Sequence, residues 1–153
     1  MAFSELCTFG RYYCFGCCII DNARPSRKDL ANAFKCNTIN FKQFKSLKKF
    51  AERPNTGDVR ACGVCNNLII KNNKVLCPLH PELAGEDLRK RTFCFKNYLC
   101  DTAEKYNEWP KEKQKRFLKF IKSKKPDWYT FSMNIEDGTW LKEFTKQWRL
   151  AKS

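Results

Sequence analysis

The chain has 153 residues, the length of one ordinary domain, and a formal net charge of +14. Hydrophobic residues make up 42% of it, including 13 Phe and 4 Trp, which is enough for a packed core and excludes wholesale disorder. No stretch reaches the roughly 18 uninterrupted apolar residues of a membrane-spanning helix. The first residues include Glu5, Arg11 and several cysteines, unlike a secretory signal, so we expect an intracellular protein, cytoplasmic or nuclear.

Basic residues gather in two stretches of the chain. Residues 35–60 hold seven lysines and arginines against two acids, and residues 111–125 hold eight against one acid, Glu112. Such clusters raise the local potential and favour polyanions such as nucleic acid or an anionic membrane face. Lysine-rich helix faces are also commonly only solvated, so charge alone supports both interpretations.

The first part of the chain predicts two helices. Ser26 and Asp29 have the spacing of a capping box, which predicts a helix through Phe34. Asn40 is a candidate cap for a second, amphipathic helix that ends at the loop signal of residues 53–57. Its apolar residues recur every three positions and its lysines lie mostly on the other side: Phe41, Phe44, Leu47 and Phe50 against Lys42, Lys45, Lys48 and Lys49.

The last part of the chain also predicts helices. Pro110 suits the first position of a helix that ends before Pro126, with an apolar stripe of Phe117, Leu118 and Ile121. Thr139 is a candidate cap for a final helix after the turn at Gly138. One face of that helix would carry Trp140, Leu141, Phe144 and Trp148.

One constellation has the spacing of a metal site. Cys62, Cys65, Cys77 and His80 follow the pattern C-x2-C-x11-C-x2-H. Two thiolates three positions apart can wrap around an ion, and a hairpin with its turn at 71–74 would bring back the second pair to complete a tetrahedron. These four residues predict a structural Zn²⁺ site. Because His80 is the only histidine, sites with two or more His ligands are excluded.

The turn that carries Cys62 and Cys65, the hairpin that follows it and a helix expected at 81–90 together resemble treble-clef and zinc-ribbon modules. The resemblance covers residues 62–80. The resemblance implies a zinc-stabilised α+β module but no single function, because such modules occur in nucleases, ribosomal proteins, transcription factors and protein-binding adaptors. A redox C-x2-C site would need a helix directly after the motif, where Asn66 and Asn67 begin a turn. A zinc deaminase would need a P-C-x-x-C downstream of His80, and none follows.

A second Zn²⁺ site, held by four thiolates, is our hypothesis for the remaining cysteines. Its ligands would be Cys14, Cys17, Cys94 and Cys100. Cys18 or Cys36 can replace any of these, and simple packing is the alternative for Cys7 and Cys36. Four thiolates also suit an iron–sulfur cluster. The run Cys14-x2-Cys17-Cys18 resembles the C-x-x-C-C of small bacterial metal-chelating cysteine-cluster proteins, without their downstream Arg-Pro-x-x-Cys. Disulfides are disfavoured by the absent signal and the ample core.

These elements predict a single domain, mainly α with one small β-hairpin, classed as zinc-stabilised α+β. We divide it into an N-terminal segment with two helices (residues 1–60), a zinc module (61–91) and a helical basic part (92–153).

The leading functional hypothesis is a small accessory or regulatory zinc protein that binds nucleic acid non-specifically through basic helices. The contact residues would be Lys42, Lys45, Lys48, Lys49, Arg89, Lys90 and Arg91, extended by residues 111–125. Aromatic side chains that could stack on unpaired bases, or else belong to the core, are Tyr98, Trp109, Trp128 and Tyr129. The alternative is a protein-interaction module that docks a partner on Trp140, Phe144 and Trp148. We do not expect an enzyme, because a zinc-bound His80 cannot act as a general base.

Overall fold

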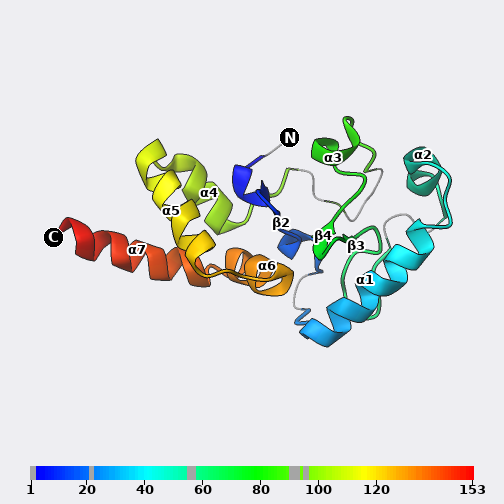
Figure 1. Cartoon of the computed structure of the whole chain (residues 1–153), viewed down its shortest axis with the longest axis horizontal. Coiled ribbons are helices and arrows are strands. Elements are labelled where there is room, and N and C mark those ends of the chain that lie inside the picture. The colour runs from blue at the N-terminus through cyan, green and yellow to red at the C-terminus, as the bar shows by residue number, and fades with distance from the viewer. Residues whose placement is uncertain (1–2, 21–22, 55–57, 90–93, 95–96) are drawn as a thin grey trace. The chain divides into compact units, whose positions relative to one another are not determined.

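The computed structural model describes residues 3–20, 23–54, 58–89, 94 and 97–153 (Figure 1). This part of the chain is mainly helical, with two pairs of short antiparallel strands, which confirms the predicted mainly helical α+β class. None of the helices described is long and apolar enough to cross a membrane.

The chain divides into two compact units. Met1–Gly16 and Asn97–Ser153 form the first, called here the helical unit, and Cys17–Lys96 form the second, called the cysteine unit. The predicted sections 1–60, 61–91 and 92–153 differ from these units, because the first residues of the chain pack with the C-terminal helices. That packing joins segments far apart in sequence, which no local pattern indicates.

The helical unit combines a short N-terminal segment with four helices. The segment contains the 3-10 turn η1 (Glu5–Cys7) and the paired strands β1 (Thr8–Phe9) and β2 (Tyr12–Tyr13). The helices are α4 (Asp101–Glu108), α5 (Lys111–Ser123), α6 (Trp128–Glu136) and α7 (Thr139–Lys152). Pro110 directly precedes α5 rather than occupying its first position, and Gly138, with φ of 76°, lets the chain turn from α6 into α7.

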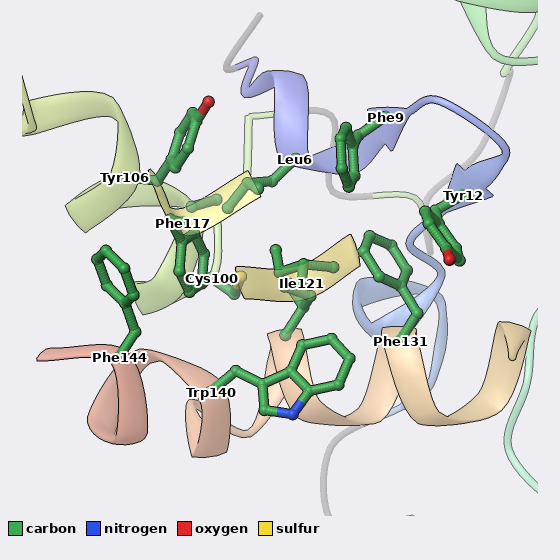
Figure 2. Close-up of a cluster of buried hydrophobic side chains, with 12 residues drawn as sticks. Leu6, Phe9, Tyr12, Cys100, Tyr106, Phe117, Ile121, Phe131, Trp140 and Phe144 are labelled. Carbon is green, nitrogen blue, oxygen red and sulfur yellow. The ribbon is translucent and has the colours of Figure 1, made fainter. Parts of the chain in front are cut away.

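An aromatic core holds the helical unit together (Figure 2). Its buried members are Leu6, Phe9, Tyr12, Cys100, Ala103, Tyr106, Phe117, Ile121, Phe131, Ile135, Trp140 and Phe144. The predicted stripe of α5 is confirmed for Phe117 and Ile121, which are fully buried, while Leu118 is partly buried against the cluster. The ring centroid of Phe117 lies 5.0 Å from that of Phe144 and 5.4 Å from that of Trp109, distances typical of favourable aromatic pairs.

The cysteine unit is built on α1 and a hairpin. Its elements are α1 (Arg27–Phe41), α2 (Leu47–Ala51), β3 (Ile69–Lys71), β4 (Lys74–Leu76) and α3 (Pro81–Ala84); the 3-10 turn η2 (Gly16–Cys18) spans its start. The predicted capping box is confirmed: the Ser26 hydroxyl accepts the Asp29 N–H and the Asp29 carboxylate accepts the Ser26 N–H. The predicted hairpin is confirmed too, with Asn72 and Asn73 both at positive φ, as a type I′ turn requires.

Two predicted helices differ from the structure. The helix expected to start at Asn40 is wrong: α1 continues through Phe41, and α2 starts at Leu47, where the Ser46 hydroxyl accepts the Lys49 N–H at 3.2 Å. The phenylalanines still pack, since the centroids of Phe41 and Phe50 are 4.9 Å apart. The helix expected over 81–90 ends at Ala84, because Gly85 takes a left-handed φ of 79°.

Candidate metal centre and basic surface

Cys65 precedes β3 by four residues, Cys77 directly follows β4, and both cysteines are buried. The strand register pairs Ile69 with Leu76, so the chain entering β3 and the chain leaving β4 converge. Buried Asn37 of α1 fixes the entering chain: its side-chain amide donates to the Cys65 carbonyl at 3.2 Å and to the Leu68 carbonyl at 2.8 Å. The structure thus brings together the two cysteines of the predicted site that flank the hairpin.

Cys18 lies opposite Cys65. An antiparallel bridge pairs Ile19 with Val64, and the Cys65 N–H donates to the Cys18 carbonyl at 2.9 Å. In an antiparallel pair, directly opposite residues have Cβ atoms about 4.5–5.5 Å apart. The sequence predicts Cys18 only as a possible replacement ligand, because nothing local to Cys18 indicates that its segment pairs with the distant segment around Cys65.

Electrostatics also relate these thiols to Cys94. Burial raises the pKa of Cys77 to about 12, and the thiols of Cys65 and Cys94 add to the rise, while the Leu79 N–H and the Arg89 guanidinium oppose it. A hydrogen bond with Cys17, together with burial, raises the pKa of Cys18, and Cys65 and Cys77 raise it further. Cys18, Cys65, Cys77 and Cys94 are therefore electrostatic neighbours within one unit.

Backbone groups act on two of the thiols. The Asn67 N–H donates to the Cys65 Sγ at 3.5 Å. The Leu79 backbone lowers the pKa of the Cys77 thiol, against the larger effect of burial. Hydrogen bonds to the charged form favour it, so both positions are suited to hold a thiolate, the form of cysteine that binds metal.

The other two members of the predicted site, Cys62 and His80, have different surroundings. Cys62 lies in the turn closed by the Gly63 N–H to Arg60 carbonyl bond of 2.8 Å. His80 caps α3, where its Nδ1 accepts the Glu82 N–H at 3.2 Å. A neutral imidazole that accepts at Nδ1 carries its proton on Nε2 and has no second lone pair for a metal.

The predicted second site is divided between the two units. Cys14 and Cys100 belong to the helical unit, where Cys100 is part of the aromatic core and Cys14 packs against it. Cys17 and Cys94 belong to the cysteine unit, where Cys17 is exposed. The set stays a prediction, with packing as the local role of Cys14 and Cys100.

As the side chains stand, no three Cys, His, Asp or Glu side chains among the described residues are arranged to hold a metal ion. The cysteines are related to one another by backbone positions, hydrogen bonds and charges, and not by a complete coordination sphere. Both predicted zinc sites therefore remain predictions.

His80 gives a pH prediction. Burial lowers its pKa below 6.5, and the nearby Arg89 guanidinium lowers it further. The folded state therefore favours neutral His80, and this contribution to stability is full above pH 6.5 and is lost as pH falls through the lower folded value. Because His80 is the only histidine, its proton NMR resonances titrate alone and should give a midpoint below 6.5.

The variant His80→Asn, which keeps a capping oxygen, should lose the part of the pH dependence of unfolding that begins as pH falls below 6.5. A midpoint at or above 6.5 would contradict this account of its surroundings.

The predicted nucleic-acid contacts are only partly at the surface. Lys42, Lys45, Lys48 and Lys49 are all exposed. Arg89 is buried, and its guanidinium makes two bonds to the Asp87 carboxylate, at 2.9 and 3.0 Å. Lys90 and Arg91 lie outside the described residues. Arg89 thus faces a carboxylate of its own unit instead of an open surface.

A second group of cations surrounds Trp148 on α5 and α7, called here the Trp148 cluster. The distances to the Trp148 ring centroid are 5.6 Å from Lys113 Nζ, 5.7 Å from Arg116 Cζ and 4.7 Å from Lys152 Nζ. Burial lowers the pKa of Lys113, and Arg149 is close enough to lower the pKa of this lysine further. Arg116 pairs with Glu112 at 3.8 Å, but within the described ranges Lys113, Arg149 and Lys152 make no ion pair. The lysines of α5 are among the contacts predicted from the sequence, whereas Arg149 and Lys152 are not.

Most of the aromatic residues predicted to stack on bases or to dock a partner make contacts within their own unit. The Tyr98 hydroxyl donates to the Glu136 carboxylate at 2.9 Å, and the Trp109 ring contacts Phe117 and Phe144. Trp140 and Phe144, two of the three residues of the predicted protein-docking face, are buried in the core of their own unit. Trp148 remains partly exposed.

Comparison of the chain with models of known protein families, with curated proteins and with solved structures found no match. The candidate sites therefore stand on the geometry and chemistry of this chain.

Proposed function

We propose that this protein binds nucleic acid non-specifically through basic helical surfaces, and that a bound Zn²⁺ stabilises its cysteine unit. The single observation that carries the binding proposal is the Trp148 cluster. The support for zinc is the buried pair Cys65 and Cys77, together with the Asn67 N–H that donates to the Cys65 sulfur.

The Trp148 cluster combines the two features that single-stranded nucleic acid requires. Lys113, Arg149 and Lys152 supply positive charge with no acidic partner in the part of the chain described, and like charges held together are relieved by a polyanion. The indole of Trp148 supplies a flat apolar face beside them, on which a base can stack. Phosphate contacts from such side chains position the strand without reading its sequence.

A second basic surface is supplied by exposed lysines that follow α1 or lie on α2, called here the α1–α2 lysines: Lys42, Lys45, Lys48 and Lys49. They lie in the cysteine unit, whereas the Trp148 cluster lies in the helical unit. Each surface is therefore tested by itself.

Substitution of the Trp148 cluster tests the binding proposal. We expect Lys113→Gln with Arg149→Gln to weaken binding of a labelled oligothymidine and to flatten the plot of log K against log salt. Two lost contacts to a single strand change that slope by roughly 1.4. Fluorescence anisotropy titrations between about 50 and 200 mM salt measure both effects.

The matched control removes two charges elsewhere, with Lys28→Gln on α1 and Lys105→Gln on α4, and should leave the slope almost unchanged. The same titration with all four α1–α2 lysines changed to Gln measures the second surface. Equal slopes for wild type and the Lys113/Arg149 variant would remove the Trp148 cluster from the proposal. Failure of the wild type to bind either single strands or duplex at low salt would end the nucleic-acid proposal.

A further inference from the structure

We infer that the β3–β4 hairpin inserts its tip, residues 71–74, into the major groove of duplex DNA, while the α1–α2 lysines contact the flanking phosphates. This inference rests on the nucleic-acid part of the proposed function. It names a partner for the second basic surface that differs from the single strand proposed for the Trp148 cluster.

The hairpin has a buried base and an exposed tip. Val75, next to the tip, is buried, whereas Lys71 is exposed and Lys74 is half-buried. Lys71 pairs directly with Lys74 across the two strands. The turn between these lysines consists of Asn72 and Asn73, which are both exposed. The tip therefore presents two cations beside two amides.

The two lysines of the tip carry positive charge that no neighbouring acid balances. The sequence has no acidic residue between Asp58 and Glu82, and neither Lys71 nor Lys74 makes an ion pair with any residue that the structure describes. Like charges directly opposite one another on paired strands are destabilising. A polyanion that contacts both lysines relieves this repulsion.

The hairpin is fixed to α1, close to where the α1–α2 lysines begin. The Thr38 hydroxyl accepts the Ile70 N–H at 2.9 Å, and the Asn37 amide donates to the Leu68 carbonyl at 2.8 Å. β3 therefore lies beside the C-terminal half of α1 (Figure 1), and the two elements run in the same direction. Lys42 follows about one helical turn after Thr38, so the tip lies toward the end of α1 that the α1–α2 lysines follow.

The dimensions and chemistry of this surface favour a DNA duplex. Paired strands lie about 4.8 Å apart, and the major groove of B-form DNA, about 12 Å wide, admits a two-stranded ribbon. The major groove of A-form RNA is too deep and narrow for side chains to read. The tip has no aromatic side chain on which an unpaired base would stack, and the α1–α2 lysines are exposed point charges suited to phosphates.

The amides of the tip supply contacts that the lysines do not. Each Asn side chain carries a donor and an acceptor, the groups that pair with base edges in the major groove. Within the described ranges, the side chains of Asn72 and Asn73 make no hydrogen bond. Two amides distinguish few sequences, so this contact agrees with binding that is largely non-specific.

The test compares three labelled ligands by fluorescence anisotropy titration of the full chain: duplex DNA, duplex RNA of the same sequence, and oligothymidine. We expect the wild type to bind duplex DNA more tightly than duplex RNA. Lys71→Gln with Lys74→Gln should weaken binding of duplex DNA. The same variant should reduce the steepness of the plot of log K against log salt by roughly 1.8, since each duplex phosphate contributes about 0.9. The slope for oligothymidine should stay the same.

The variant Asn73→Gly tests insertion separately from charge. Glycine suits the second position of a type I′ turn, so the hairpin remains while one amide is lost. We expect about two- to ten-fold weaker binding of duplex DNA, the effect of one hydrogen bond, with an unchanged salt slope. The Lys71/Lys74 variant loses a like-charge pair and should unfold at no lower temperature than the wild type, which separates loss of binding from loss of folding.

The control pair Lys28→Gln and Lys105→Gln should leave the duplex slope almost unchanged. Equal duplex slopes for the wild type and the Lys71/Lys74 variant would overturn the inference. Equal wild-type affinity for duplex DNA and duplex RNA, or full affinity for duplex DNA in Asn73→Gly, would overturn it too. Binding of oligothymidine without binding of duplex DNA would overturn the inference and leave the nucleic-acid proposal standing. A wild type that binds none of the three ligands would instead end that proposal, and the inference with it.

Discussion

Replacement of Phe117 by alanine is expected to lower the free energy of unfolding of the helical unit by about 3–5 kcal/mol, the usual cost of emptying a buried aromatic site. Phe117 is fully buried, and its ring contacts those of Tyr106, Trp109, Phe120 and Phe144. These neighbours come from three helices and the turn between α4 and α5, so they cannot all move into the space that the ring leaves. Denaturant unfolding followed by circular dichroism measures the loss.

The matched control is Phe3→Ala, because Phe3 is 47% exposed. It should change the free energy of unfolding much less than Phe117→Ala, by about 0.5 kcal/mol or less if it behaves as an ordinary surface site. Should Phe117→Ala be too unstable to measure, Phe117→Leu fills part of the space and should give an intermediate value. Equal losses for Phe3→Ala and Phe117→Ala would contradict the assignment of Phe117 to the core.

If the cysteine unit binds zinc as proposed, removal of the ion is expected to open that unit and leave the helical unit folded. Binding free energies of structural zinc reach about 10–16 kcal/mol in zinc-finger peptides, comparable to the whole stability of a typical domain. The segments around Cys18, Cys65 and Cys77 are joined by isolated bridges and one hairpin of three-residue strands, so little regular sheet holds them together. Without the ion, we expect their amides to lose protection.

Hydrogen exchange measured by mass spectrometry, before and after a strong chelator, tests this expectation. Amides of residues 58–80 should exchange at least ten-fold faster after chelation, and zinc returned to the sample should restore their protection. The amides of α4–α7 serve as the internal control, because the aromatic core of the helical unit contains neither Cys65 nor Cys77. Unchanged exchange in residues 58–80 would show that these segments fold without the metal.

Local features of the fold follow from the sequence. The Ser26 capping box, the Asn72–Asn73 turn and the buried stripe on α5 are each confirmed, because each depends on residues only a few positions apart. The exceptions are also local: a competing cap at Ser46 and an early left-handed Gly85 set the bounds of α2 and α3. The recurrence of apolar residues over 41–50 did not by itself distinguish one continuous helix from two helices whose phenylalanines pack together.

The candidate sites depended on tertiary structure to a larger extent. Sequence spacing grouped Cys62, Cys65, Cys77 and His80, but the structure pairs Cys65 with Cys18, since antiparallel register between distant segments decides which side chains face one another. From the sequence alone, Arg89 is a candidate phosphate contact. Only the folded structure shows that its guanidinium is buried against the Asp87 carboxylate.

The sequence by itself determined the helical class, the caps and turns, the net positive charge and the presence of many thiols, because these are properties of composition and of neighbours along the chain. Tertiary structure alone decided which cysteines face one another, which aromatic residues are buried in the core and which cations gather around Trp148. Those features depend on contacts between segments far apart in sequence, whose geometry is set by the packing of the whole unit.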